Sequence, residues 1–343
     1  MKKLLNTLYI TTETSYLTLD GENIVVSVNK EEKVRFPLHL FESIICFSYP
    51  GASPALMGKC AKEGIGLSFY TPKGHFLTRC SNGVHGNVLL RKAQIMASEN
   101  PEKCLAIAKS FLLGKLFNSR WTLERTKRDN ALRVDCALLE EVSKSIHKET
   151  SQSQCAQNID TLRGVEGLAA NQYFGVFDAM ILNNKEDFHF TVRSKRPPLD
   201  RINALLSFAY SLLANDCANA LEGVGLDPYV GFLHCDRPGR FSLALDLMEE
   251  LRSCFADRFV ISLVNRSMIT HDDFIECVNS SILLSDSGRK VFLKQWQIRK
   301  QEEIMHPFLQ VKIPWGLIPH VQALLLARYL RGDLDGYPPF LWK

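Results

Sequence analysis

Residues 76–98, FLTRCSNGVHGNVLLRKAQIMAS, contain the point at which the character of the chain changes. Residues 76–80 suit one arm of a hairpin with residues 67–70, whereas the apolar residues after position 86 recur at helical spacing. Residues 81–86, polar and rich in glycine, are typical of a hinge. Strands before this point and helices after it predict the α+β class, with a small N-terminal β domain ahead of a larger, mainly α-helical domain.

Residues 1–85 form the predicted β domain. Residues 16–19 and 24–28 have the β-branched and aromatic composition of strands, and the turn sequence DGEN between them predicts a hairpin. A short helix is expected over residues 55–62, because Gly64 is placed to end it. No group of residues in this domain is typical of a catalytic site.

Residues 86–332 form the predicted helical domain. Apolar periodicity indicates helices over residues 87–98, 101–117, 121–141, 162–182, 201–221, 241–255, 287–305 and 319–329. The polar stretch 144–158 predicts a surface loop or a frayed helix end. Residues 333–343, which contain Pro338 and Pro339, predict an extended tail available for docking on a partner.

Bulk composition limits the class of protein. The chain has 343 residues, of which 46% are hydrophobic and 23% charged, as in ordinary globular proteins with well-formed cores. Its formal charge of +4 is too small to indicate nucleic-acid binding by itself. The cysteines show no CxxC pair and no Cys/His ligand spacing, which argues against a zinc site and a disulfide framework. No signal peptide or apolar run of membrane length is visible, so a cytoplasmic protein is expected.

Residues 231–252, GFLHCDRPGRFSLALDLMEELR, concentrate unlike chemistry in a short span. Its notable charged residues are His234, Asp246, Glu249 and Glu250, with Arg237 and Arg240 beside the histidine. A histidine with several carboxylates is a mixed nitrogen and oxygen ligand set for a divalent metal, and the arginines suit a phosphate. The combination suggests metal-assisted phosphoryl chemistry. The competing interpretation is an ordinary amphipathic helix with a solvated acidic face.

A second block, RGVEGLAANQYF at residues 163–174, places one carboxylate among packed residues. Helical spacing aligns Glu166 with Ala169, Ala170, Tyr173 and Phe177. A buried ionised carboxylate is costly without a partner, and a metal or an arginine would serve. The alternative is a glutamate near the start of its helix that interacts with the helix dipole.

Together these blocks resemble the CRISPR adaptation integrase family, the near-universal nuclease that inserts new spacers into CRISPR arrays. The resembling residues are Glu166 in EGLAANQYF, His234 in GFLHCDRPGR, and Asp246 with Glu249 in SLALDLMEELR, supported by RSKRPPLDRINALLSFAYSLL at residues 193–213. The likeness extends over nearly the whole chain. Glu249 stands where many relatives have Asp, and Glu250 follows it directly, so the sequence leaves open which glutamate binds the metal.

The resemblance implies a catalytic site of Glu166, His234, Asp246 and Glu249. Glu166, His234 and Glu249 are the expected ligands of Mg²⁺ or Mn²⁺, while Asp246 either joins them or orients His234. A DNA 3′-hydroxyl, or water in the hydrolytic version, then attacks the phosphate. The expected substrates are short duplex fragments and the leader-proximal repeat of a CRISPR array.

The resemblance also implies an assembly in a prokaryotic cytoplasm. Residues 1–85 are expected to form a homodimer interface, and the dimer is expected to work with a small ferredoxin-like CRISPR adaptation protein. Three alternatives remain: a metal-dependent nuclease acting on branched DNA, a non-catalytic DNA-bridging scaffold, and a helical regulatory module that binds no nucleic acid.

Clusters of basic residues supply candidate DNA contacts. Those chosen are Arg120, Arg125, Arg128, Arg193, Lys195, Arg196, Arg237 and Arg240. The first three follow one predicted helix and suit a ridge that tracks phosphates. Taken singly, each group is better explained as solvated surface than as a DNA contact.

Overall fold

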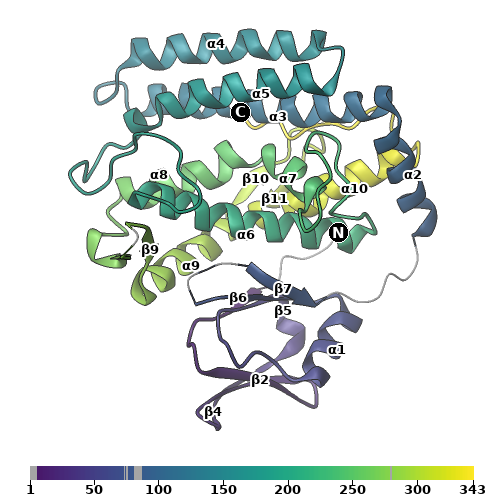
Figure 1. Cartoon of the computed structure of the whole chain (residues 1–343), viewed down its shortest axis with the longest axis vertical. Coiled ribbons are helices and arrows are strands. Elements are labelled where there is room, and N and C mark those ends of the chain that lie inside the picture. The colour runs from purple at the N-terminus through teal and green to yellow at the C-terminus, as the bar shows by residue number, and fades with distance from the viewer. Residues whose placement is uncertain (1–5, 73, 75, 81–86, 279) are drawn as a thin grey trace.

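The computed structural model describes residues 6–72, 74, 76–80, 87–278 and 280–343. Figure 1 shows a small strand-rich part beneath a larger stack of helices, so the predicted α+β class is confirmed. The predicted hinge at residues 81–86 lies outside the described residues. No described helix combines the length and apolarity needed to cross a membrane.

Two sheets and one helix make up the strand-rich part. One sheet has the order β1 (Asn6–Ile10), β5 (Phe41–Cys46), β6 (Gly66–Tyr70) and β7 (Phe76–Cys80), with β7 antiparallel to β6 and the other neighbours parallel. The other sheet is the antiparallel set β2 (Ser15–Asp20), β3 (Asn23–Val28) and β4 (Glu31–Pro37). Leu17, Ile44 and Leu67 are fully buried in the core of this part.

Local sequence signals explain the elements that were predicted well here. The hairpin β2–β3 pairs Asp20 with Asn23 across the turn, as expected. Helix α1 (Pro54–Glu63) begins after Ser53, whose hydroxyl accepts a hydrogen bond from the Leu56 amide. It ends at Gly64, which has a φ of 71° that favours glycine. Both predictions are confirmed.

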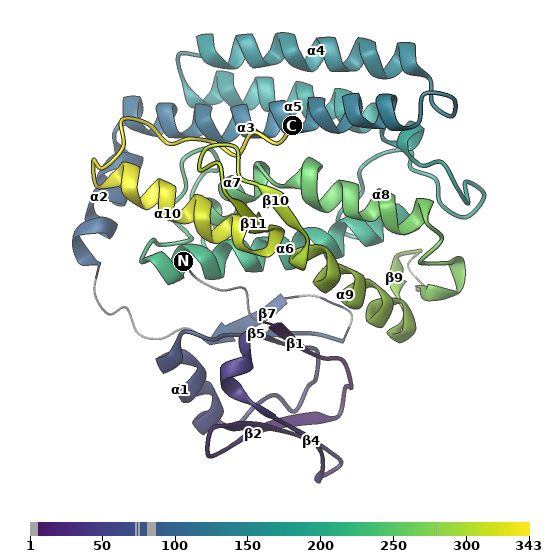
Figure 2. The same cartoon turned by 180° about the vertical axis from the view of Figure 1, so that it is seen from behind.

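The remaining helices stack in layers above the sheets. Their bounds are α2 (Val88–Glu99), α3 (Pro101–Asp129), α4 (Cys136–Cys155), α5 (Ile159–Gly175), α6 (Arg201–Val224), α7 (Ser242–Glu249), α8 (Arg258–Asn265), α9 (Asp286–Gln301) and α10 (Ile318–Leu330). Figures 1 and 2 show α3, α4 and α5 as one outer layer, with α6, α8 and α10 below it and α9 nearest the sheets. Short antiparallel pairs β8–β9 (Phe274–Glu276, Ile282–Leu284) and β10–β11 (Glu303–Met305, Lys312–Pro314) flank α9.

Two loop predictions in the helical domain are wrong. The expected break between residues 117 and 121 does not exist, because Asn118 and Ser119 are buried within the continuous helix α3. The stretch 144–158 is not a surface loop over most of its length, since α4 continues to Cys155. Ile146, Glu149 and Ser153 are buried there, whereas Lys144, His147 and Lys148 are exposed, so this stretch is a helix with one buried and one solvated face.

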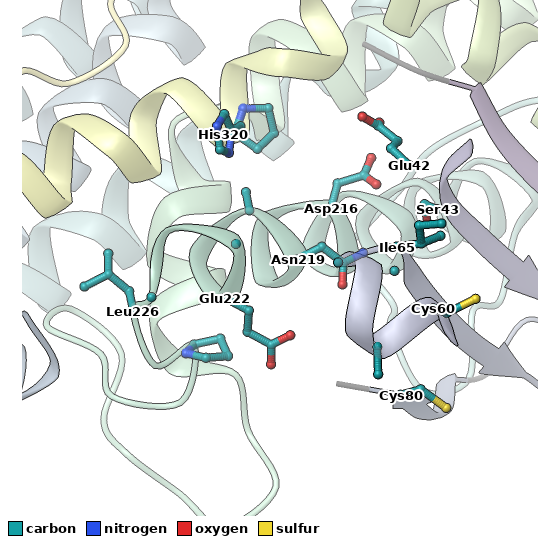
Figure 3. Close-up of a pocket in the computed structure, with 18 of the residues that line it drawn as sticks. Glu42, Ser43, Cys60, Ile65, Cys80, Asp216, Asn219, Glu222, Leu226 and His320 are labelled. Atoms are coloured by element: carbon teal, nitrogen blue, oxygen red, sulfur yellow. The ribbon is translucent and has the colours of Figure 1, made fainter. Parts of the chain in front are cut away.

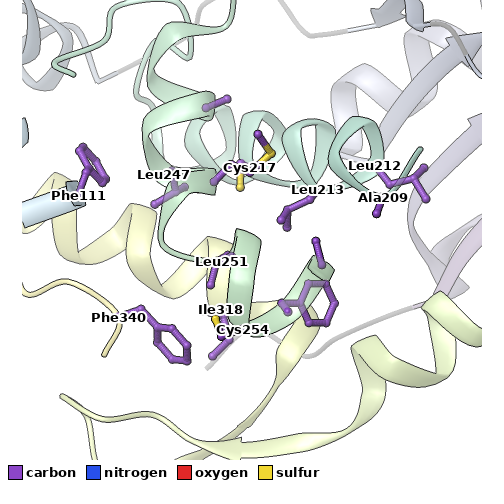
Figure 4. Packing of buried hydrophobic residues seen from close by; sticks show 14 of the residues in the cluster. Phe111, Ala209, Leu212, Leu213, Cys217, Leu247, Leu251, Cys254, Ile318 and Phe340 are labelled. Atoms are coloured by element: carbon purple, nitrogen blue, oxygen red, sulfur yellow. The ribbon is translucent and has the colours of Figure 1, made fainter. Parts of the chain in front are cut away.

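The predicted helix at residues 241–255 also ends early. Helix α7 ends at Glu249, and the π-helical turn η3 (Arg252–Asp257) leads directly into α8, which the sequence did not predict. Single π-helical turns are rare in proteins overall, but those that occur are often found at functional sites. Leu247, Leu251 and Cys254 remain buried through this change and belong to the same core cluster as Cys217 of α6, part of which is shown in Figure 4.

The segment after α10 forms no helix or strand and packs on the molecule itself. Phe340 is fully buried and lies beside Ile318 in the core view. Tyr337 and Trp342 are also buried. The expectation of a tail available to a partner is therefore wrong for these residues, whose apolar rings are covered by the helical domain.

Candidate metal centre

Three helices, α3, α5 and α7, and the loop before α7 carry the residues of the candidate centre. Glu166 comes from α5, His234 from the loop before α7, and Glu249 from the last position of α7. Lys115 of α3 lies between the two carboxylates, paired with Glu166 and 2.9 Å from Glu249 Oε2. His234 Nε2 lies 3.8 Å from Glu249 Oε1. The lysine ammonium thus joins two of the predicted ligands, and the third, His234, faces Glu249.

Asp246 fixes the position of His234. Its carboxylate is fully buried and accepts the backbone amides of Phe232, Leu233 and His234 at 2.7–3.0 Å. The same carboxylate lies 2.7 Å from His234 Nδ1. Because a carboxylate accepts hydrogen bonds, Nδ1 carries the proton and Nε2 is left as the free ring nitrogen facing Glu249. Of the two roles expected for Asp246, its geometry matches the one that orients His234.

The loop that carries His234 is held tightly. A Cβ built at Gly231 would lie 2.9 Å from the carbonyl oxygen of His234, so only glycine permits this close approach. Gly239 has a φ of 74° in the turn that leads into α7. Arg240 donates to the carbonyl of Cys235, which closes the turn. Gly239 and Arg240, the last two residues of the DRPGR sequence, therefore shape the loop.

Glu249 is an ionised carboxylate in a buried setting. Only 2% of its surface is exposed. Burial would raise its pKa, but attraction to Arg252, Lys115 and His234 outweighs that effect and lowers the pKa to about 2. Arg252 Nη2 lies 3.2 Å from Glu249 Oε1 and the guanidinium stands over the Tyr210 ring. The side chain is thus already in the charged form that a metal ligand requires.

Glu250 faces the opposite way. Its carboxyl accepts hydrogen bonds from the Tyr337 hydroxyl (2.6 Å), the Phe340 amide (2.9 Å) and the Gln322 side chain (2.7 Å). Burial raises its pKa to about 8 against the effect of these hydrogen bonds. The structure therefore places Glu249, and not Glu250, on the side of His234 and Glu166.

Glu166 differs from both expectations about its surroundings. It is the eighth residue of α5, well beyond the first turn, so the helix-dipole alternative is wrong. Its side chain is 29% exposed rather than fully packed, and its partner is Lys115 rather than an arginine. A carboxylate at the edge of a buried site can face both an internal cation and an incoming ligand.

The donor set suits a divalent metal in chemistry, although no three His, Cys, Asp or Glu side chains of the described chain are spaced to hold one as they stand. The ammonium of Lys115 is a stand-in cation between two of the three expected ligands. Glu249 Oε2 is buried and, despite its proximity to Lys115, has no aligned hydrogen bond. One imidazole nitrogen and two carboxylates match the preferences of Mn²⁺ and Mg²⁺.

The sequence analysis missed Lys115, Arg252 and Asn118. Lys115 lies in the apolar run FLLGKLF at residues 111–117, where a single charge inside a helix pattern was the available signal. Asn118 donates to the carbonyls of Glu250 and Phe340 and accepts the Trp342 amide, which no local pattern could reveal.

The candidate DNA contacts fall into different surroundings. Arg193, Lys195, Arg196 and Arg240 line one cavity of about 480 Å³ together with Arg252, and no aspartate or glutamate is among its described lining residues. Arg193 also donates to Asn203 Oδ1 at 2.6 Å, so part of its role is structural. Arg237 is an exposed loop residue. Arg120, Arg125 and Arg128 lie on α3, where Arg125 stands 4.1 Å from the Trp342 ring centre.

A larger cavity of about 520 Å³ lies elsewhere, between the four-stranded sheet and α6. Figure 3 shows Asp216, Asn219 and Glu222 of α6 opposite Glu42 and Ser43 of the sheet. Lys300 lies 3.1 Å from Asp216 and 3.9 Å from Glu42, so a buried cation joins the two parts of the molecule here. The metal ligands predicted from the sequence do not line this cavity.

Comparisons with known proteins agree with these features. The family described as CRISPR associated protein Cas1 matches residues 8–298. A protein of Chlorobaculum tepidum named CRISPR-associated endonuclease Cas1 1 is 46% identical over 343 residues, covering 100% of both chains. The fold is similar to a solved casposase bound to integration product, with a TM-score of 0.84, 24% identity, and coverage of 99% of this chain and 95% of that one. It is also similar to a chain of a Cas6-RT-Cas1--Cas2 complex, with a TM-score of 0.82, 20% identity, and coverage of 100% and 36%.

Proposed function

The chain belongs to the Cas1 family of CRISPR-associated proteins, and on that premise we propose that it is a metal-dependent DNA endonuclease and integrase. In this proposal it inserts short duplex DNA fragments, as new spacers, into a CRISPR array. The observation that carries the proposal is that one ammonium, that of Lys115, contacts both Glu166 and the ionised Glu249, while His234 Nε2 faces Glu249. A cavity lined by five cationic side chains opens near the same helix end, at Arg252.

Each residue of the centre has a distinct role in this proposal. Glu166, His234 and Glu249 would hold Mg²⁺ or Mn²⁺, which when bound polarises the scissile phosphate and stabilises the charge that develops on it. Asp246 keeps the proton on His234 Nδ1 and so keeps Nε2 available. Arg252, together with Lys115 and His234, outweighs the effect of burial and lowers the pKa of Glu249 to about 2, so the carboxylate is ionised at neutral pH.

The cationic cavity supplies the means to admit a polyanion. Arg193, Lys195, Arg196 and Arg240 line it with no opposing carboxylate among the described residues, so a phosphate backbone lowers the repulsion among them. Phe76, Phe208 and Phe241 also line it and offer faces on which a base can stack. Joining rather than simple cleavage then requires that a DNA 3′-hydroxyl, instead of water, reach the phosphate.

The proposed assembly includes a partner. The named relative is an endonuclease, and the solved similar chains were studied with an integration product or in a complex with Cas2. We therefore propose that this chain acts as a homodimer with a small ferredoxin-like CRISPR adaptation protein.

The test uses purified protein and a fluorescent branched DNA that mimics a half-integrated product, with Mn²⁺ or with EDTA. Wild type is compared with Glu166→Ala and Glu249→Ala, and with Glu102→Ala as a control at an exposed position of α3. Strand joining that needs metal, persists in the control and disappears in both site variants supports the proposal.

Other outcomes point to the alternatives. Metal-dependent cutting without joining, also on a mini-array with supplied fragments, identifies a nuclease for branched DNA that uses the same residues. Salt-sensitive DNA binding with neither reaction in wild type identifies a scaffold instead.

A further inference from the structure

Lys115 occupies the middle of the candidate centre, and its contacts suggest a specific task. We propose that Lys115 is a resident counter-ion, which fills the centre in the metal-free protein and must be displaced before a divalent ion binds. This inference rests on the proposed function, since it concerns the metal affinity of the same centre. Lys115 would then be the side chain that keeps the affinity of the centre for a divalent metal low.

The position of Lys115 is set by three helices. It projects from α3, is 8% exposed, and its ammonium contacts Glu166 of α5 and Glu249 at the end of α7. Within the described parts of the chain, these two carboxylates are its recorded ion-pair partners. If Glu166 and Glu249 held a metal ion, that ion and the Lys115 ammonium would compete for the same two carboxylates.

Arg252 and Lys115 differ in how firmly the surrounding residues hold their side chains. Arg252 contacts the other oxygen of Glu249, at 3.2 Å, and stacks 5.0 Å from the centre of the Tyr210 ring. No ring of the described residues lies under the Lys115 ammonium as Tyr210 lies under Arg252, and the flexible four-carbon stem of the lysine allows the ammonium to move outwards. The void beside it, lined also by Ser119 and Tyr173, measures about 20 Å³, which is room for about one water.

The charges of the two carboxylates and of the competing cations explain why a divalent ion displaces the Lys115 ammonium. Without Lys115, Glu249 would keep its ion pair with Arg252, whereas Glu166 would lose the ammonium that contacts it, so the metal-free centre needs the lysine. A divalent ion replaces one positive charge with two and can bind both carboxylates directly. The apparent affinity for metal is therefore the intrinsic affinity reduced by the fraction of molecules in which the lysine has left.

The inference is tested by Mn²⁺ binding, measured from the free-ion signal in electron paramagnetic resonance. Lys115→Met removes the charge and keeps the length of the side chain. We expect Lys115→Met to bind Mn²⁺ at least about tenfold more tightly than wild type, because no resident cation competes. We also expect the variant to melt at a lower temperature without metal and to gain more from added Mn²⁺.

Lys300→Met is the matched control. Lys300 is a buried lysine that also lies between two carboxylates, Asp216 and Glu42, at the other cavity. Its loss should lower the melting temperature while leaving the Mn²⁺ affinity unchanged, which separates general destabilisation from an effect at the centre.

Each remaining outcome decides a different claim. Equal or weaker Mn²⁺ binding by Lys115→Met overturns the inference and makes the lysine an organiser of the ligands. Failure of both wild type and Lys115→Met to bind Mn²⁺ overturns the proposed metal centre itself. If Lys115→Met does not fold, Lys115→Gln is measured in its place with the same expected direction.

Discussion

Glu249 and Glu250 are consecutive residues with nearly equal burial and opposite chemistry. Both side chains are at most 2% exposed. The pKa of Glu249 is lowered to about 2 and that of Glu250 is raised to about 8, although burial favours the neutral form of each. Glu249 meets two cations and an imidazole, whereas Glu250 meets a phenol, an amide side chain and a backbone amide.

This difference shows that partners, rather than depth, set the charge of a buried carboxyl. Glu249 faces a centre built to hold charge, and Glu250 secures the segment Tyr337–Trp342 through neutral hydrogen bonds. Asn118 reinforces the second side by donating to the backbone carbonyl of Glu250. The C-terminal end of α7 thus has an ionic face at Glu249 and a neutral face at Glu250. Substitution on each face should change a different property, activity on the ionic face and stability on the neutral face.

The largest expected effect is on the ionic face. Glu249→Gln keeps the shape but removes the charge that a metal ligand needs, so strand cleavage and joining should fall by about 100-fold or more. Glu250→Gln should stay within about threefold of wild type in the branched-DNA assay, because it lies behind the centre. Equal losses in the two variants would erase the functional distinction between the faces.

The second effect is on stability at the neutral face. Glu250→Ala leaves the Tyr337 hydroxyl and the Phe340 amide without their acceptor, removes one of the acceptors of the Gln322 amide, and opens a cavity. The free energy of unfolding should fall by about 3 kcal/mol or more, measured by urea denaturation at pH 7. Glu250→Gln retains a carbonyl acceptor, and the loss should be smaller. A change below about 1 kcal/mol in Glu250→Ala would show that the contacts with residues 337–340 contribute little.

A third effect concerns pH. The folded pKa of Glu250, about 8, exceeds the ordinary value of 4.5, so the folded protein binds more protons than the unfolded chain between these values. The free energy of unfolding should therefore fall as pH rises through this window and level off above about 8.

Denaturation at pH values from about 6.5 to 8.5 measures this slope. This interval lies above the range of Asp257, whose pKa burial raises to about 6. Wild type should lose about 2 kcal/mol more than Glu250→Gln, and parallel curves would contradict the assignment. Glu249 acts with the opposite sign: its lowered pKa stabilises the fold above about 4.5, and this is lost as pH falls towards 2.

The smallest expected effect is at the outer edge of the neutral face. Arg125 stands over the ring of Trp342, and Arg125→Gln should lower the free energy of unfolding by about 0.5–1 kcal/mol. Arg128→Gln is the control on the same helix, since its exposed pair with the neighbouring Asp129 should contribute little. An equal change in both variants would assign the effect to surface charge.

Local patterns predicted the parts of the fold that local chemistry determines. The hairpins, the capped helix α1 and most helices of the second part follow from turn residues and apolar spacing. The family resemblance carried by the acidic and histidine blocks brought Glu166, His234 and Glu249 into one hypothesis, and the structure links them through Lys115 and Glu249.

The features that escaped prediction depend on contacts distant in sequence. A polar residue such as Asn118 between two apolar stretches suggested a break between helices. Its hydrogen-bond partner, Trp342, is 224 residues away, so local sequence could not show that Asn118 is buried within one helix. The π-helical turn after Glu249 does not interrupt the apolar residues, so their spacing concealed it. Lys115 gains its meaning only when α5 and α7 approach α3.

The hydrogen bond from the Phe340 amide to Glu250 spans 90 residues, which has a consequence during synthesis on the ribosome. At about 5–20 residues per second, roughly 4–18 s separate the appearance of the two partners. During that interval the nascent chain already contains every candidate ligand, yet the helix end that carries Glu249 lacks the segment that secures its other face. Maturation of the centre is thereby tied to translation through residue 342.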